Sequence, residues 1–119
     1  MVKKLTTTLF FLFFTLCINA QDISCSELLD IVTSKYDSKK TAHCYTSTML
    51  IKVNYYKLDG HGFVVAYIKK NDYDFRGTPY VFCGITNSKW NSFTFDATYG
   101  GSWGKSFHKN IIDNTCNCY

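Results

Sequence analysis

The chain has 119 residues, the length of a single domain. It is 46% apolar and 18% aromatic, with one Pro and seven Gly, and this much apolar surface excludes a disordered tail, a collagen-like repeat and a low-complexity linker. The 13 basic and 9 acidic residues give a formal charge of +4. A net charge this small gives no electrostatic reason to expect a nucleic acid or an anionic membrane as partner.

Residues 1–20 have the pattern of a secretory signal peptide. Lys3 and Lys4 form a basic start, an apolar run extends from Leu9 to Ile18, and small Ala20 precedes the expected cleavage. The run is too short to cross a bilayer, which takes roughly 20 residues, so no transmembrane segment is expected. We therefore predict a mature chain of residues 21–119 that is secreted or periplasmic. Its net charge is +2, from 11 basic and 9 acidic residues.

A second interpretation of this segment makes Cys17 the lipidated cysteine of a bacterial lipoprotein. Leu16 stands directly before it, where such sites normally have a small residue. The signal peptide is therefore the favoured interpretation.

Five cysteines remain in the mature chain, and an exported chain meets conditions in which disulfides form. They are Cys25, Cys44, Cys83, Cys116 and Cys118. Since five is odd, at least one thiol stays free or pairs with another molecule. The sequence does not select one pairing, but we favour a bridge from Cys25 to Cys116 or Cys118. Such a bridge closes a loop of about 90 residues and contributes on the order of 4 kcal/mol.

The Cys116-Asn117-Cys118 segment has three interpretations. A metal site needs two more ligands, and no His or Cys lies nearby with suitable spacing. A redox pair needs a helix N-terminus or a basic neighbour to lower a thiol pKa, whereas this pair follows a predicted helix C-terminus. Two structural half-cystines are favoured, and no metal or other cofactor is expected.

The mature chain begins with a predicted helix over Ser24–Tyr36. Ser24 and Glu27 have the spacing of a capping box, and an apolar stripe follows. The stripe consists of Cys25, Leu28, Leu29, Val32 and Tyr36. Asp37–Thr41 is polar and is expected to be a loop.

Three strands are predicted next. Ser47–Lys57 alternates between apolar and polar residues and is expected to have one face exposed to water. Asp59–Gly62 is a turn in which Gly supplies positive φ, and Phe63–Ile68 is apolar on both faces, as in a central strand. Residues 69–77 form a connection to the third strand, Tyr80–Thr86. The core-facing residues of the first strand are expected to be Met49, Ile51, Val53 and Tyr55.

The remainder is helical. Asn87 or Ser88 is expected to cap a short helix that carries Trp90 and Phe93, followed by a loop over residues 95–101. Ser102 is expected to cap a second helix, whose apolar face is Trp103, Phe107 and Ile111. Because the strands are grouped, the fold class is α+β: an N-terminal helix, a three-stranded antiparallel sheet and one or two C-terminal helices. All helices are expected on one face.

Residues 47–112 resemble the KTSC family, named for the C-terminal domain of some lysyl-tRNA synthetases and also found as small bacterial proteins. The resemblance rests on the segments Ser47-Thr48, Val53-x-Tyr55, Tyr80-Val81-Phe82, Gly84-Ile85 and Ser102-x-Gly104-x-x-Phe107-His108-x-x-Ile111. The chain departs from the family pattern at Phe82, Thr86 and His108, where the family has Tyr, Pro and Asn. The resemblance implies no established catalytic activity. It implies an RNA-binding role, which transfers poorly to an exported chain.

No catalytic constellation stands out in the sequence. His43 adjoins Cys44, but neighbours in sequence do not form a nucleophile–base pair without spatial contact. His61 lies in the predicted turn. His108 is either a ligand-facing donor in a groove beside Tyr80 or, as we favour, a partly buried imidazole bonded to a carbonyl group. The candidate binding residues are Tyr80, Phe82, Ser102 and His108.

The remaining feature is the aromatic content. Tyr suits interfaces, because it buries area and keeps a polar tip, and the tyrosines expected to be exposed are Tyr45, Tyr56, Tyr73 and Tyr99. The aromatic residues either form a surface for a protein, peptide or glycan or simply fill a small core. We predict a small exported binding domain without catalysis. The alternatives are a thiol–disulfide redox protein using Cys116 and Cys118, and an RNA-binding module.

Overall fold

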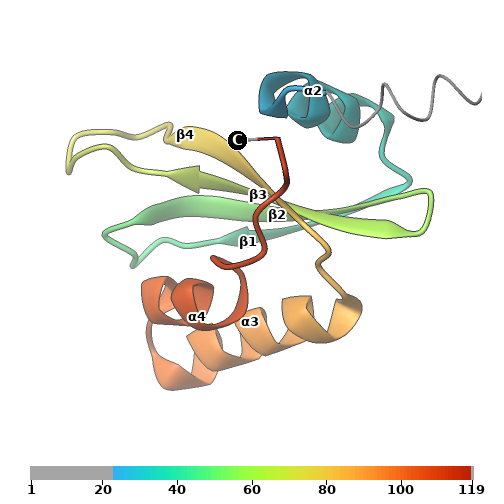
Figure 1. Cartoon of the computed structure of the whole chain (residues 1–119). Coiled ribbons are helices and arrows are strands. Elements are labelled where there is room, and N and C mark those ends of the chain that lie inside the picture. Colours follow the sequence, from blue (N-terminus) through green and yellow to red (C-terminus); the bar gives the residue numbers. More distant parts are fainter. Residues whose placement is uncertain (1–22, 119) are drawn as a thin grey trace, which may run out of the picture.

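The computed structural model describes residues 23–118, so the predicted signal peptide, Cys17 included, lies outside the described residues. The fold is α+β, as predicted, with a helix first, then a sheet, then two helices (Figure 1). The elements are α2 (Cys25–Lys35), β1 (Ser38–His43), β2 (Leu50–Leu58), β3 (His61–Ile68), β4 (Thr78–Cys83), α3 (Asn87–Gly100) and α4 (Trp103–Asn110).

The sheet has four antiparallel strands in the order β1-β2-β3-β4, not three. The additional strand is β1, in the segment that we expected to be a loop. It pairs along its full length with β2, from Ser38 opposite Lys57 to His43 opposite Lys52. Its sequence shows no alternation because it is an edge strand on which only Ala42 is buried. Strand β1 forms because its backbone pairs with that of β2, and not because its own side chains are buried.

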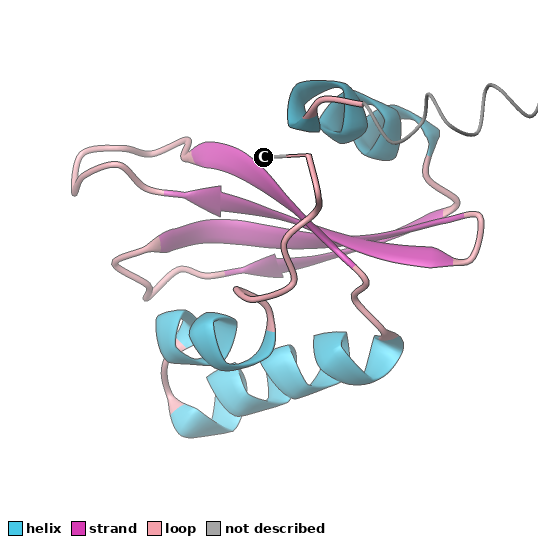
Figure 2. Ribbon diagram, in the orientation of Figure 1, coloured by secondary structure: helices cyan, strands magenta, loops and turns pink. Residues whose placement is uncertain are grey.

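The two C-terminal helices share one face of the sheet, as predicted, but the N-terminal helix covers the other face, so the prediction that all helices lie on one face is wrong. Helix α2 lies on one face, and α3 and α4 lie on the other (Figures 1 and 2). Strand β2 is accordingly buried on both sides: Val53 and Tyr55 face α3 and α4, while Asn54 and Tyr56 are buried beneath the other face. The expected water-exposed face of this strand, and the expected exposure of Tyr56, are therefore wrong.

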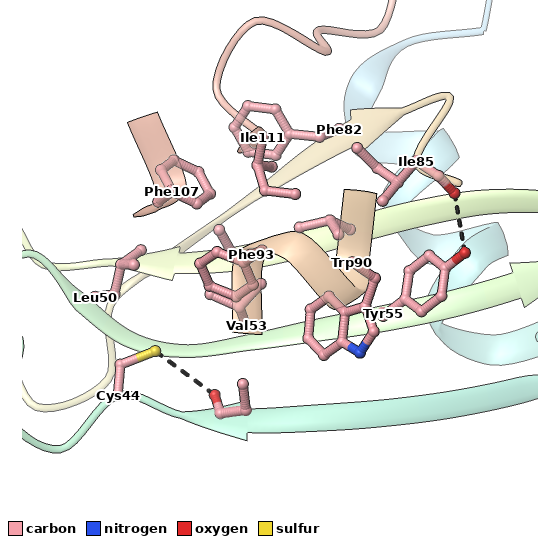
Figure 3. Packing of buried hydrophobic residues seen from close by; sticks show 13 residues of the cluster. Cys44, Leu50, Val53, Tyr55, Phe82, Ile85, Trp90, Phe93, Phe107 and Ile111 are labelled. Carbon is pink, nitrogen blue, oxygen red and sulfur yellow. Dashed lines mark hydrogen bonds between the residues drawn. The ribbon is translucent and has the colours of Figure 1, made fainter. Parts of the chain in front are cut away.

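The face covered by α3 and α4 holds the larger core, which is rich in aromatic rings (Figure 3). Phe93 and Phe107 are fully buried and lie edge to face, with ring centroids 6.3 Å apart. Tyr55 stacks on Trp90 at 5.2 Å, and its hydroxyl donates to the Ile85 carbonyl oxygen at 3.0 Å. Rings in these arrangements gain about 0.5–1.5 kcal/mol beyond the area that they bury.

Helices α2 and α4 begin where their capping residues predict. Ser24 and Glu27 form the expected capping box, in which each side chain accepts from the other residue's backbone N–H. Ser102 accepts from the backbone N–H of Lys105. Each cap satisfies backbone donors that the helix leaves without a partner.

Helix α3 is longer than predicted and includes most of the expected loop over residues 95–101. Thr86, not Asn87 or Ser88, caps its start and accepts from the Lys89 N–H at 3.1 Å. The buried stripe continues from Phe93 to Ala97, and the helix ends at Gly101 with φ 80°. The extension is hard to recognise in the sequence, because its one buried residue, Ala97, is small.

Strand β2 and the turn that follows it differ in detail from the sequence prediction. A register shift between Leu50 and Lys52 buries Leu50 in the core, where Ile51 was expected. The β2–β3 turn is confined to Asp59 and Gly60, both with positive φ, as two-residue hairpin turns require. Gly62 instead belongs to β3, where the Ile85 carbonyl oxygen approaches so closely that a Cβ atom has no room. Glycine is needed there for close approach of two backbones.

After α4, residues 111–118 form a tail that runs along the β4 edge from the α3–α4 side to the α2 side (Figure 1). Thr115 forms a β-bridge with Phe82, and the backbone N–H of Cys83 donates to the Asn114 carbonyl oxygen at 2.8 Å. Further along the same edge, Pro79 has no N–H to offer a partner strand. These features protect an edge that could otherwise pair with another chain.

Candidate functional site

Two disulfides attach the tail to the rest of the domain. Cys25 is bonded to Cys118, one of the two pairings favoured from the sequence, and Cys83 is bonded to Cys116. The bonds join residues 93 and 33 positions apart, with Cα atoms separated by 4.9 and 5.0 Å. Cys116 and Cys118 are thus bonded to distant cysteines and not to each other. The two bonds are consistent with an extracellular or periplasmic location.

Cys44 is the free cysteine among the described residues, and it lies in the core. Its Sγ donates to the Ala42 carbonyl oxygen at 3.7 Å (Figure 3). Burial raises the pKa of this thiol from 9.0 to about 12, so the nucleophilic thiolate is suppressed. His43 is exposed and stacks on Tyr45, with ring centroids 5.5 Å apart. Successive residues at the end of a strand point to opposite faces, which separates His43 from the Cys44 thiol.

A shallow apolar groove lies where β4 meets the tail. Its volume is about 490 Å³, and its lining residues are Ile68, Tyr80, Phe82, Ile112 and Thr115. We call it the β4 groove. It brings together β3, β4 and the segment after α4, which are far apart in the sequence. Only Tyr80 and Thr115 contribute side-chain polar groups to this lining, so the groove is suited to an apolar ligand group.

Phe82 and Tyr80 have different roles in this groove. Phe82 is nearly buried and packs edge to face on Phe107, with ring centroids 5.4 Å apart, so it forms the floor. Tyr80 is 40% exposed, which places it at the rim. Alternate residues of a strand share a face, and this explains why a Tyr-x-Phe sequence brings both rings to one site.

The other two candidate binding residues lie elsewhere. Ser102 caps α4 and borders a separate polar hollow of about 130 Å³ beside residues 46–49. His108 is exposed on α4, with its ring 6.4 Å from that of Phe107, and it is not part of the β4 groove lining. The expectation of a partly buried imidazole at this position is wrong. His61, at the start of β3, is also exposed.

Three lining residues of the β4 groove were not identified from the sequence as binding candidates. Ile68 and Ile112 have the appearance of ordinary core residues of a strand and a helix end. Thr115 reaches the groove only because the disulfides and the β-bridge to Phe82 hold the tail in place. A disulfide pairing that the sequence left open thus helps to place Thr115 in the lining of the groove.

Among residues 23–118, no group of three or more His, Cys, Asp or Glu side chains is arranged to hold a metal ion. Within the same part of the chain, no helix has the length and apolar character needed to cross a membrane. The chain matches no family model, no curated protein and no solved structure. The resemblance to the KTSC family therefore stays a prediction.

Proposed function

We propose that this chain is an exported, KTSC-like binding domain whose β4 groove receives an apolar side chain from a peptide or protein partner. The observation that carries the proposal is the groove itself, with aliphatic and aromatic walls and Tyr80 half-exposed at its rim. A tyrosine at such a position offers contact area and a hydroxyl group that can bond to a peptide backbone.

The chemistry of the groove favours a peptide over a glycan. Sugar hydroxyl groups need several convergent polar partners, whereas the groove offers the Tyr80 and Thr115 hydroxyl groups beside apolar walls. Pairing of a partner strand with β4 is restricted, because Pro79 has no N–H and the Cys83 N–H is already bonded to Asn114. The partner is therefore expected to insert a side chain and not to extend the sheet.

Export is supported by the sulfur chemistry and by the signal-peptide pattern of residues 1–20. A non-reducing peptide map of the protein recovered from outside the cytosol tests this part. We expect an N-terminal peptide that begins at Gln21 and two linked pairs, Cys25–Cys118 and Cys83–Cys116. An uncleaved N-terminus with five free thiols would refute export. A labile bond between Cys116 and Cys118 would favour the redox alternative.

Binding is tested by an NMR titration of the mature domain with N-acetyl-leucinamide and N-acetyl-tryptophanamide. We expect shifts confined to the β4 groove residues, and a loss of these shifts in Tyr80→Asp. The matched control is Phe95→Asp, which changes an exposed aromatic residue on α3 and should leave the titration unchanged. Shifts outside the groove, or shifts that persist in Tyr80→Asp, would contradict the proposal. Salt-sensitive binding of RNA would instead favour the RNA-binding alternative.

A further inference from the structure

The two edges of the sheet differ in what covers them (Figure 1). The β4 edge is blocked by the tail and by Pro79. Strand β1 forms the other edge, and its main packing partner among the described elements is β2. The register with β2 runs from Ser38 to His43 without a bulge, and β1 contains no proline. Strand β1 therefore lacks the cover, the proline and the bulge by which proteins commonly block a sheet edge.

The backbone of β1 presents hydrogen-bonding groups with the spacing of a strand. In an antiparallel pair, residues whose N–H and C=O groups bond to the partner strand alternate with residues whose groups point away from it. The Cys44 N–H donates to the Ile51 carbonyl oxygen at 3.0 Å, which fixes this alternation. The groups of Lys39, Thr41 and His43 therefore point away from β2, and they have no hydrogen-bond partner in the part of the chain that the structure describes. The ligand that fits such a row is another extended backbone.

The space beside β1 is open on both faces of the sheet. Five of the six residues of the strand are exposed, and Ala42 is the buried one. Successive residues of a strand point to opposite faces, so the exposed residues lie on the α2 side and on the α3–α4 side. Neither helical layer therefore extends far enough over β1 to obstruct a further strand.

The charges near this edge indicate which extended segment it favours. Strand β1 carries Lys39 and Lys40, and neither β1 nor β2 contains Asp or Glu. The closest acidic residues along the chain, Asp37 and Asp59, lie together beside the start of β1, where the Asp59 N–H donates to the Asp37 carboxylate at 2.9 Å. Across residues 35–59, five lysines and two aspartates leave a net charge of +3. The positive charge is therefore reduced at one end of β1 but is not cancelled.

A second copy of the domain is disfavoured as the added strand. Pairing of two β1 strands would bring Lys39 and Lys40 of both copies into one short interface, and like charges across a strand pair are destabilising. A segment with acidic side chains would instead place opposite charges beside these lysines. The lysines thus discourage self-pairing and leave the edge open to a segment of opposite charge.

We infer that β1 is a docking edge for an extended, acidic segment of a partner protein, which adds a further strand to the sheet. Main-chain bonds to Lys39, Thr41 and His43 supply the affinity. The side chains of Lys39 and Lys40 select acidic residues in the partner. This edge lies across the sheet from the β4 groove, so the inference does not depend on the proposed function.

The test is an NMR titration of the mature, disulfide-bonded domain with the peptide acetyl-Thr-Val-Glu-Glu-Val-Thr-amide at millimolar concentration. Its adjacent Glu side chains point to opposite faces of a strand, as those of Lys39 and Lys40 do. The matched control peptide has Lys in place of both Glu residues. Binding should slow hydrogen exchange of the Lys39, Thr41 and His43 amides, and it should be about tenfold tighter for the acidic peptide.

Two variants separate the main-chain bonds from the charges. Thr41→Pro removes an outward N–H that the β1–β2 pairing does not use, so the sheet should stay intact while the acidic peptide binds about tenfold more weakly. Lys39→Gln/Lys40→Gln, at two exposed positions, should abolish the preference for the acidic peptide. Native far-UV circular dichroism is expected for both variants.

Unchanged exchange of the three amides in the presence of the acidic peptide would overturn the inference. Equal binding by the wild type and a natively folded Thr41→Pro variant would also overturn it, because charge alone would then explain the binding. So would an undiminished preference for the acidic peptide in Lys39→Gln/Lys40→Gln. Slower exchange of these amides at higher protein concentration without peptide would make a second copy the occupant. Thr41→Pro should respond to N-acetyl-leucinamide as the wild type does, which separates this test from that of the β4 groove.

Discussion

The two faces of the sheet are stabilised in different ways. On the α3–α4 face, a large core of stacked and edge-to-face rings holds the helices, with Phe93 and Phe107 at its centre. On the α2 face, the buried cluster is small and centres on Val32, Tyr56 and Val81. The four disulfide-bonded cysteines all belong to this second cluster, whereas the free Cys44 lies in the first.

The positions of the disulfides show which face of the sheet needs more than side-chain packing to be stable. A helix of 11 residues with one fully buried side chain gains little from apolar burial. Small domains commonly compensate with crosslinks, and here both crosslinks tie the tail to the α2 side. The tail therefore connects the two helical layers around the β4 edge (Figure 2). The stability of the α2 face therefore depends more than that of the α3–α4 face on an oxidising environment, in which the disulfides form.

The largest effect should come from removing the Cys25–Cys118 bond in the variant Cys25→Ser/Cys118→Ser. The residues are 93 positions apart, and the entropy of the unfolded chain predicts a loss of about 4.7 kcal/mol in the free energy of unfolding. Urea denaturation measures this loss. Hydrogen exchange should show α2 amides opening well before those of α3 and α4.

The matched comparison is Cys83→Ser/Cys116→Ser, where the separation of 33 residues predicts a smaller loss of about 3.7 kcal/mol. The difference between the two faces would be refuted if the Cys25→Ser/Cys118→Ser variant exchanged its α2 and α3 amides at the same free energy.

Truncation of one residue on each face sharpens the comparison. Phe107→Ala should cost about 3–5 kcal/mol, because it leaves a cavity against Phe82 and Phe93. Val32→Ala on the α2 face should cost about 2 kcal/mol, since fewer atoms are removed. Phe95→Ala, on the exposed side of α3, serves as the control and should stay within about 0.5 kcal/mol of the wild type. Thermal or urea unfolding measures the loss of stability in the three variants. An equal loss in Phe107→Ala and Val32→Ala would contradict the difference between the two faces.

Gly62→Ala tests the close fit of backbones on the α3–α4 side. Its Cβ atom would meet the carbonyl group of Ile85, which also accepts from the Tyr55 hydroxyl. Overpacking of this kind costs about 1–3 kcal/mol. Gly100→Ala is the control: it lies in α3 with open space around it, and alanine there should stabilise by up to about 1 kcal/mol. A neutral Gly62→Ala variant would show that the strand can shift away from Ile85.

Much of this fold could be predicted from local patterns. The capping residues Ser24 and Ser102, and the apolar periodicity after them, located two helices because these signals act within a few residues. Strand β1 could not be found in this way, since its pairing with β2 depends on a partner elsewhere in the chain. The burial of Tyr56 was missed for the same reason, because its cover comes from contacts with α2 and not from its own strand.

The candidate site was predictable only in part. The alternation of Tyr80 and Phe82 was sufficient to bring both rings to one groove. The place of Thr115 depends on the disulfide pairing, which spacing does not determine. His108 follows Phe107 directly on a helix, and a one-residue step turns the side chain about 100° away, out to solvent. A residue can therefore lie within a recognisable motif and still be absent from the groove.

The smallest effect concerns Cys44, the thiol on the α3–α4 face. Iodoacetamide should modify it in the unfolded chain but only slowly in the native domain at about pH 8, because burial keeps the thiol protonated and covered. The pKa of about 12 in the folded state lies above the ordinary 9.0, so the stability that this thiol contributes is complete below pH 9 and is lost as the pH rises toward 12. As the pH increases, the free energy of unfolding measured with urea should therefore fall more steeply for the wild type than for Cys44→Ala. Equal slopes, or native labelling as fast as in the unfolded chain, would place Cys44 outside the core and remove the contrast between the two sets of cysteines.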